Sequence, residues 1–249
     1  LGDGILCYNI EEKTLKLKEG QFINGALIIT APEDVSIDLE ANASHVVEGD
    51  LIVNGAKDVK VTKLADGGAA AAIQGKAEIS CSGDVILKNL GGNTHDGRNL
   101  TSGGLTVHRA NTVTTEGGIS GETIINCTGD IELGNEWGTT VSKLTVNSAN
   151  NVKVTSGSVN RSIDQGGAEI TCSGIVELDS YRYSYYNLGK VSFTQANGKP
   201  YVYIMAKSSE YAKSSEYKDS RITPIPETIE KRYLRIEPRE TYSITVKNG

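Results

Sequence analysis

A short unit of alternating apolar and polar residues recurs along the chain. It reads AEISCSGDVIL at 77–87, ETIINCTGDIEL at 122–133 and AEITCSGIVEL at 168–178. On both sides of a central corner, inward apolar residues recur at the two-residue period of a β-strand. The corner itself is built from Ser, Thr, Gly and Asp, which favour tight turns. The pattern therefore predicts two short strands joined at a corner.

The spacing of the units indicates a coiled stack of such strands. Ile79 and Val85, the first inward residues of the two strands, lie six residues apart. The same six-residue interval separates the inward residues of six further units, at 29–35, 53–59, 107–113, 125–131, 146–152 and 170–176. Phe193 begins a looser copy of the unit. Successive units begin 18 to 28 residues apart. A period of about 20 to 50 residues is typical of a solenoid.

Each turn has room for a third short strand. The candidates are the segments 45–49, 71–75, 99–103, 140–143 and 162–166. The uneven length of the turns favours the right-handed form, because left-handed helices usually keep a strict hexapeptide repeat. We therefore predict an all-β fold, a single-stranded right-handed parallel β-helix of about eight coils of 18–28 residues, with a β cap at each end.

The chain divides into four parts on this reading. Residues 1–25 are predicted to form an N-terminal β cap, and residues 26–205 the parallel β-helix. Residues 206–220, which contain the duplicated hexamer KSSEYA/KSSEYK, are predicted to be a polar excursion loop. Residues 221–249 contain YLRIEP and TYSITV and are predicted to form a C-terminal β-hairpin cap. Caps are expected because a solenoid has apolar ends that need covering.

Three of the four cysteines hold the same place in the repeated unit. Cys81, Cys127 and Cys172 share the inward parity of the anchor residues and lie two coils apart, which places them ~9.6 Å from one another. A disulfide needs Cα atoms within about 7 Å, and ligands at such spacing cannot share one metal ion. We expect three free, buried thiols. The state of Cys7 is left open by the sequence.

Composition narrows the class of partner. The 249 residues carry a net charge of −6, which disfavours nucleic acid and anionic membranes as partners. No apolar run approaches the ~20 residues of a membrane span. The chain starts at Leu1 rather than Met, so we expect a mature or trimmed chain whose signal peptide has been removed. A secreted or cell-surface monomer without a cofactor is the expectation.

Aromatic residues provide the candidate ligand-binding site. Aromatics make up only 6% of the chain, yet the segment 181–186 holds four tyrosines. In strand geometry Tyr181, Tyr183 and Tyr185 share one face, and Trp137 lies in a predicted loop. Such residues suit stacking on sugar rings if they face outward, and they fill the core or fix a loop if they face inward. A polysaccharide or glycan is the partner this hypothesis implies.

Catalytic readings have less support in the sequence. Glu132 and Glu177 flank equivalent corners two coils apart, a separation that admits an inverting glycosidase pair. No DD or DxD motif accompanies them. The loop at 89–104 contains His95 and Asp96, but a metal site needs three or four converging ligands. We therefore predict a non-catalytic protein, with no catalytic or metal-ligating residue assigned.

A resemblance to a known family adds to this reading. YNIEEKTLKL at 8–17, followed by ALIITAPEDVSIDLEANASHVVEGDLIVNGAKDVKVT at 26–62, resembles β-helix surface proteins of gut and other anaerobic Firmicutes. These proteins are often described as containing a carbohydrate-binding domain. The resemblance implies the β-helix fold and carbohydrate binding, and it assigns no individual binding residue. Two functions thus remain open, a surface module that binds carbohydrate or another ligand, and a structural spacer within a larger surface protein.

Overall fold

The structure is a computed structural model in which every regular element is a β-strand. It describes residues 4–64, 70–91, 98–135, 140–157, 162–164, 166–180, 189–206, 228–229 and 233–239. No helix occurs among these residues. The strands form two long sheets and a narrow third face, which together enclose one aliphatic core.

The first sheet contains eleven strands. In spatial order they are β1 (Leu6–Asn9), β2 (Thr14–Leu17), β4 (Ser36–Ala41), β6 (Val59–Lys63), β8 (Val85–Asn89), β11 (Val113–Glu116), β13 (Ile131–Asn135), β15 (Val152–Ser156), β17 (Val176–Ser180), β21 (Tyr233–Pro238) and β19 (Tyr201–Ala206). From β2 to β17 every neighbouring pair is parallel.

The second sheet runs beside the first along the same axis. In spatial order it contains β3 (Leu27–Thr30), β5 (Leu51–Asn54), β7 (Ala77–Ser80), β10 (Leu105–Arg109), β12 (Gly118–Asn126), β14 (Val141–Ser148), β16 (Ala168–Cys172), β18 (Gly189–Gln195) and β20 (Thr228–Ile229). The short strand β9 (Asn99–Thr101) pairs with the beginning of β12. From β3 to β18 all pairs are parallel.

The third face consists mainly of single bridges. Parallel bridges join Ile23, Val47, Ile73 and Thr101 in succession, and another joins Val141 to Ile163. All five segments predicted to supply a third strand therefore take part in this face. Ile119 also contributes to this face, by pairing with Thr101 and Val141 at the start of β12, and this contribution was not predicted.

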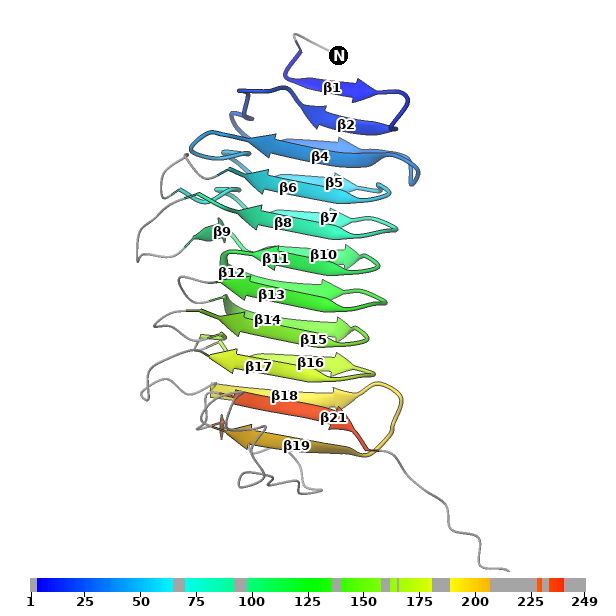
Figure 1. Cartoon of the computed structure of the whole chain (residues 1–249), viewed down its shortest axis with the longest axis vertical. Coiled ribbons are helices and arrows are strands. Elements are labelled where there is room, and N and C mark those ends of the chain that lie inside the picture. Colours follow the sequence, from blue (N-terminus) through cyan, green and yellow to red (C-terminus); the bar gives the residue numbers. More distant parts are fainter. Residues whose placement is uncertain are drawn as a thin grey trace, which may run out of the picture.

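The solenoid is right-handed and has seven complete two-strand turns. Figure 1 shows the near strands β4 to β17 running opposite to the far strands behind them as the chain descends from the N-terminal end. Each turn places one strand in each long sheet. The predicted number of coils was about eight. The eighth begins with β18, but β21 takes the place beside β17 that its second strand would occupy.

The predicted inward anchors lie in register. Cα partners link Ile29, Val53, Ile79, Val107, Ile125, Val146, Ile170 and Phe193 through the second sheet. One interval differs from the prediction. Ile37, rather than Val35, pairs with Val59, because the first corner contains Pro32, whose carbonyl accepts a hydrogen bond from the Val35 amide. That corner is therefore longer than the others.

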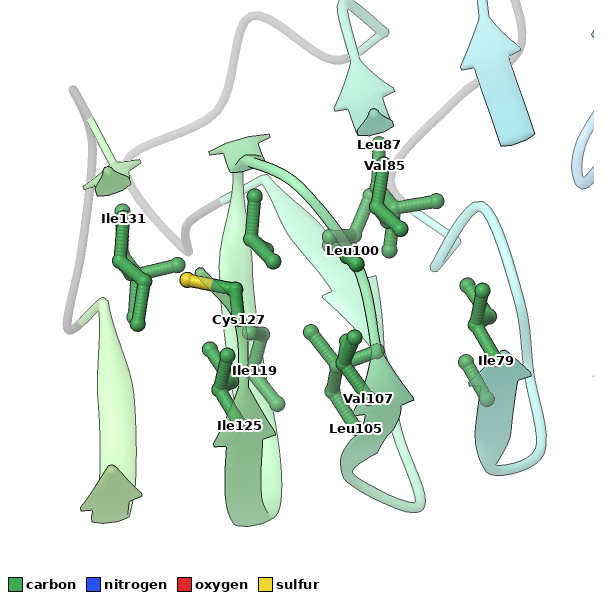
Figure 2. Close-up of a cluster of buried hydrophobic side chains, with 14 of the residues drawn as sticks. Ile79, Val85, Leu87, Leu100, Leu105, Val107, Ile119, Ile125, Cys127 and Ile131 are labelled. Atoms are coloured by element: carbon green, nitrogen blue, oxygen red, sulfur yellow. The ribbon is translucent and has the colours of Figure 1, made fainter. Parts of the chain in front are cut away.

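The core is a stack of aliphatic side chains. Ile79, Val107 and Ile125 of one sheet face Val85 and Ile131 of the other, all fully buried or nearly so. Figure 2 shows these side chains pointing into the space between the two sheets. Burying large aliphatic side chains contributes roughly 1.5–3 kcal/mol each, so the repeated inward positions are the main source of stability.

Corner residues connect one turn to the next. The amide of Gly83 donates to the carbonyl of Lys57 in the preceding turn, and its own carbonyl accepts from Asn111. A Cβ at Gly83 would lie 2.7 Å from that Lys57 oxygen, so a side chain there would collide with backbone. The carboxylate of Asp58 accepts a hydrogen bond from the Asp84 amide of the next turn.

The two ends of the stack depart from the parallel pattern. At the N-terminal end β1 pairs antiparallel with β2, which is itself parallel to β4. At the other end β21 lies antiparallel between β17 and β19, and β20 pairs antiparallel with β18. In the predicted C-terminal hairpin, Leu234 and Ile236 are buried in β21, whereas residues 240–249 lie outside the described part of the chain.

A pair of adjacent isoleucines tests the inward and outward assignment. Ile125→Asp places a charge in the aliphatic core and should cost several kcal/mol of folding stability, whereas Ile124→Asp places the same group on the outer face. Thermal unfolding followed by circular dichroism should show a large loss for the first variant and a small one for the second. Equal losses would contradict the assignment of faces.

Candidate functional site

The predicted ligand-binding residues lie outside the described part of the chain. This applies to Tyr181, Tyr183, Tyr185 and Trp137. Strand β17 ends at Ser180 and β18 begins at Gly189, so the described residues stop before the tyrosine run and resume after it. His95 and Asp96 of the long loop also lie outside the described residues. The tyrosine site therefore stays a prediction.

Two further tyrosines lie on β19. Tyr201 is half-buried, and its ring lies 4.9 Å from that of Phe193 in an edge-to-face arrangement. Tyr203 is buried. Strand β19 is separated from β17 by β21, so these side chains do not lie on the strand next to the end of β17.

The outer face of the first sheet is covered by ion pairs between successive turns. Lysine side chains reach carboxylates on the neighbouring strand in three places, Lys60 with Asp38 at 3.3 Å, Lys88 with Glu116 at 3.6 Å and Lys153 with Glu132 at 2.8 Å. Arg235 on β21 continues the pattern with Glu177 at 3.4 Å. Exposed pairs contribute about 0–1 kcal/mol each. Their main consequence is that the charges of this face are matched locally.

The candidate glycosidase pair belongs to this ion-paired face. Lys153 lies in register between Glu132 and Glu177. The pKa of Lys153 is raised, first by its hydrogen bond to Glu132 and then by the negative charges around it. An inverting pair needs room between its carboxylates for the attacking water. Lys153 occupies the strand position between Glu132 and Glu177.

The outer face of the second sheet has a different composition. One row follows the sheet in register: Ile28, Ile52, Glu78, Thr106, Ile124, Thr145, Glu169, Ser192. A second row beside it contains Thr30, Asn54, Ser80, Arg109, Asn126, Ser148, Thr171 and Thr194. Most members of both rows are uncharged. Arg109 pairs with Glu33 at the adjacent corner.

The least charged part of this face forms a continuous strip along the axis. We call it the axial patch, and its members on β10 to β18 are Thr106, Ile124, Asn126, Thr145, Ser148, Thr171, Ser192 and Thr194. Among the described residues, the hydroxyl groups of Thr106, Thr145 and Thr171 make no hydrogen bond within the chain. Two charged residues lie in the same rows on these strands, Glu169 in the first row and Arg109 in the second.

The axial patch was not found from the sequence, although a signal was present. Its members occupy the outward positions of the predicted strands, between inward anchors such as Val107 and Ile125. The predicted site rested on aromatic and acidic residues, without lining up the outward positions of successive turns. Doing so would have separated a charged face from a nearly neutral one.

The N-terminal end presents apolar surface. All four large apolar side chains that are exposed in the described chain, Ile5, Tyr8, Ile10 and Ile28, occur before residue 30. Close by, a half-open hollow of about 490 Å³ is lined by Lys16, Leu17, Glu19, Gly20, Asp38, Glu40, Asn42 and Leu64. Its carboxylates do not form a metal site, since no group of three or more potential ligands converges among the described residues.

A buried polar cluster fixes the edge where the long loops leave the first sheet. Lys63 is fully buried, and its Nζ donates to the carbonyl of Ala70 at 2.7 Å. Asn89 lies in register on the next turn and donates to the carbonyls of Ala70 and Asn99. Burial lowers the pKa of Lys63. These contacts hold the ends of two connections against the solenoid.

The repeated cysteines are free and buried, as predicted. Each thiol donates to the carbonyl of the glycine two residues later, Gly83, Gly129 or Gly174. In the intervening turns, alanine occupies the equivalent corner position. The backbone amide of the residue after each cysteine donates a hydrogen bond to the carbonyl of Ala56, Ala110 or Ala149. Burial raises the pKa of Cys81, Cys127 and Cys172 to about 11, whereas Cys7 is exposed.

Comparison with known proteins gives no relative from which a function could be transferred. No protein-family model, no curated protein and no solved structure matches the chain. In the part of the chain that the structure describes, no helix is long and apolar enough to cross a membrane.

Thiol labelling tests the corner geometry. In the native chain only Cys7 should react with a thiol reagent near neutral pH, because the other thiols are buried and their pKa of about 11 leaves little thiolate. Mass spectrometry should find one label per native chain and four after denaturation. Rapid native labelling of Cys127 would contradict the assigned corner.

Lys63 should give the folding stability a distinct pH dependence. Because its pKa is lowered in the folded chain, the unfolded state binds more protons between that lowered value and 10.5. Stability therefore rises with pH across this window. Urea unfolding at about pH 8 and about pH 10 measures the free energy of unfolding of wild type and of Lys63→Met. The difference between them should change in favour of wild type as the pH rises. Lys60→Met, on the outer face of the same strand, is the control for replacing a lysine of β6 by methionine.

Proposed function

We propose that this chain is a non-catalytic β-solenoid module of a secreted or cell-surface protein that binds carbohydrate or another surface ligand. The observation that carries the proposal is the contrast between the two long outer faces. Charges on the first sheet are matched by pairs such as Lys153 with Glu132, whereas the axial patch offers hydroxyl, amide and aliphatic groups along a regular strip. Such groups suit a ligand with many hydroxyls.

A non-catalytic role agrees with the acidic residues of the solenoid. Glu132 and Glu177 are the carboxylates best spaced for hydrolysis, and Lys153 lies between them. Binding along an extended surface needs no reactive group. The predicted tyrosines at 181, 183 and 185, together with Trp137, would add stacking surfaces to such a module.

A spacer function is the second candidate. Parallel pairing continues through seven turns, with local register shifts on β10 and β12, and gives a continuous rod (Figure 1). A rod of this kind separates the parts of a surface protein without a ligand of its own. The spacer differs from the binding module in one respect that is easily measured, the absence of ligand binding.

A glycan and polysaccharide screen tests the proposed function. Wild type should bind at least one member, and the triple variant Tyr181→Ala, Tyr183→Ala, Tyr185→Ala, shown by circular dichroism to be folded, should bind it more weakly. A stacked aromatic contributes roughly 1 kcal/mol or more, so the loss should reach about tenfold. If wild type binds nothing in the screen, the spacer function takes the place of the proposal.

A further inference from the structure

The axial patch has a geometry that restricts the shape of its ligand. Its residues repeat once per turn, so equivalent side chains such as Thr106, Ile124 and Thr145 lie at intervals of ~4.8 Å along the axis. Five strands, from β10 to β18, carry the patch, which corresponds to about 19 Å of length. A compact ligand would contact only part of such a strip, whereas an extended polymer parallel to the axis would contact all of it.

The charge of the patch restricts the chemistry of its ligand. The chain as a whole carries a net charge of −6. Within the two rows on β10 to β18 the charged residues are Glu169 and Arg109, and Arg109 is paired with Glu33. At the margin, Glu122 and Lys143 neutralise one another at 2.6 Å. Charges of both signs, such as Arg109 and Glu169, lie in and beside the strip, so neither a polyanion nor a polycation would meet a row of opposite charges. An uncharged polymer therefore fits this face best.

The side chains of the patch suit the two kinds of surface that a sugar presents. The hydroxyls of Thr145 and Thr171 are available to pair with sugar hydroxyls, since the chain itself does not use them. Ile124 lies between Thr106 and Thr145 in the same row and offers a half-buried aliphatic contact for the C–H face of a ring.

We propose that the axial patch binds an uncharged, extended polysaccharide lying parallel to the solenoid axis, with about one sugar per turn. Flat β-1,4-linked chains are the class that fits, because their repeat per sugar is close to the ~4.8 Å spacing of the strands. Coiled α-linked chains do not keep this repeat. The inference rests on the proposed function and specifies its ligand and the surface that holds it.

Isothermal titration with defined oligosaccharides tests the inference. The probes are β-1,4-linked glucose or N-acetylglucosamine oligomers of two, four and six sugars, with a galacturonic acid hexamer as the anionic comparison. Affinity should rise from the dimer to the hexamer, because longer chains span more turns. It should also be independent of salt, since no charges pair in the complex.

A matched pair of variants locates the binding surface. The triple variant Thr106→Ala, Thr145→Ala, Thr171→Ala should lose roughly tenfold or more in affinity, because three hydrogen-bonding positions are removed. The control Thr114→Ala, Thr155→Ala removes two outward threonines from the first sheet and should bind like wild type. Folding of both variants is checked by thermal unfolding.

The outcomes separate this inference from the proposed function. Equal binding by wild type and the Thr106/Thr145/Thr171 variant, or tighter binding of the anionic hexamer, would overturn the axial patch as the site while leaving a carbohydrate-binding module in place. Loss of binding only in the tyrosine variant would move the site to residues 181–185. An absence of binding to every probe in both this titration and the glycan screen would overturn both proposals.

Discussion

The structure depends on backbone hydrogen bonds between equivalent residues of successive turns. In the two long sheets, each strand from β4 to β16 pairs with the strand one turn before it and one turn after it. A residue's environment is therefore set by its position in the turn. This constraint explains why Ile79, Val107 and Ile125 form one column, and why glycine is needed where Gly83 meets the carbonyl of Lys57 at close range. A change at one turn is transmitted mainly to its two neighbours.

The same constraint places polar residues into columns that perform different tasks. At the corner, Asp58 accepts a hydrogen bond from the Asp84 amide, and Asp84 accepts from Thr112 in the following turn. At the opposite edge, buried Lys63 and Asn89 hold the ends of the loops. These columns satisfy polar groups that would otherwise be buried without partners, which leaves the outer faces free to vary.

Much of the fold could be predicted from the sequence because the inward positions repeat. The repeat period predicts the inward anchors and the third-strand segments. The three free cysteines were predicted because they hold the same position in the repeated unit. The corner before Ile37 was misplaced because Pro32 lengthens it, and alternation alone marks Val35 as equally suitable. Strand β21 was recognised as a strand but not placed, since a two-residue period carries no information about direction or partner.

The candidate site was harder to predict for a related reason. Inward residues are constrained by packing and therefore leave a recognisable pattern, whereas outward residues such as Thr145 are not needed for folding. Their arrangement becomes visible only when the register aligns them, as it does for Thr106, Ile124 and Thr145. Ion pairs on the first sheet are equally dispensable for the core. Folding does not determine which residues occupy either outer face. The difference in charge between the two faces is therefore the kind of feature that selection for a ligand would produce.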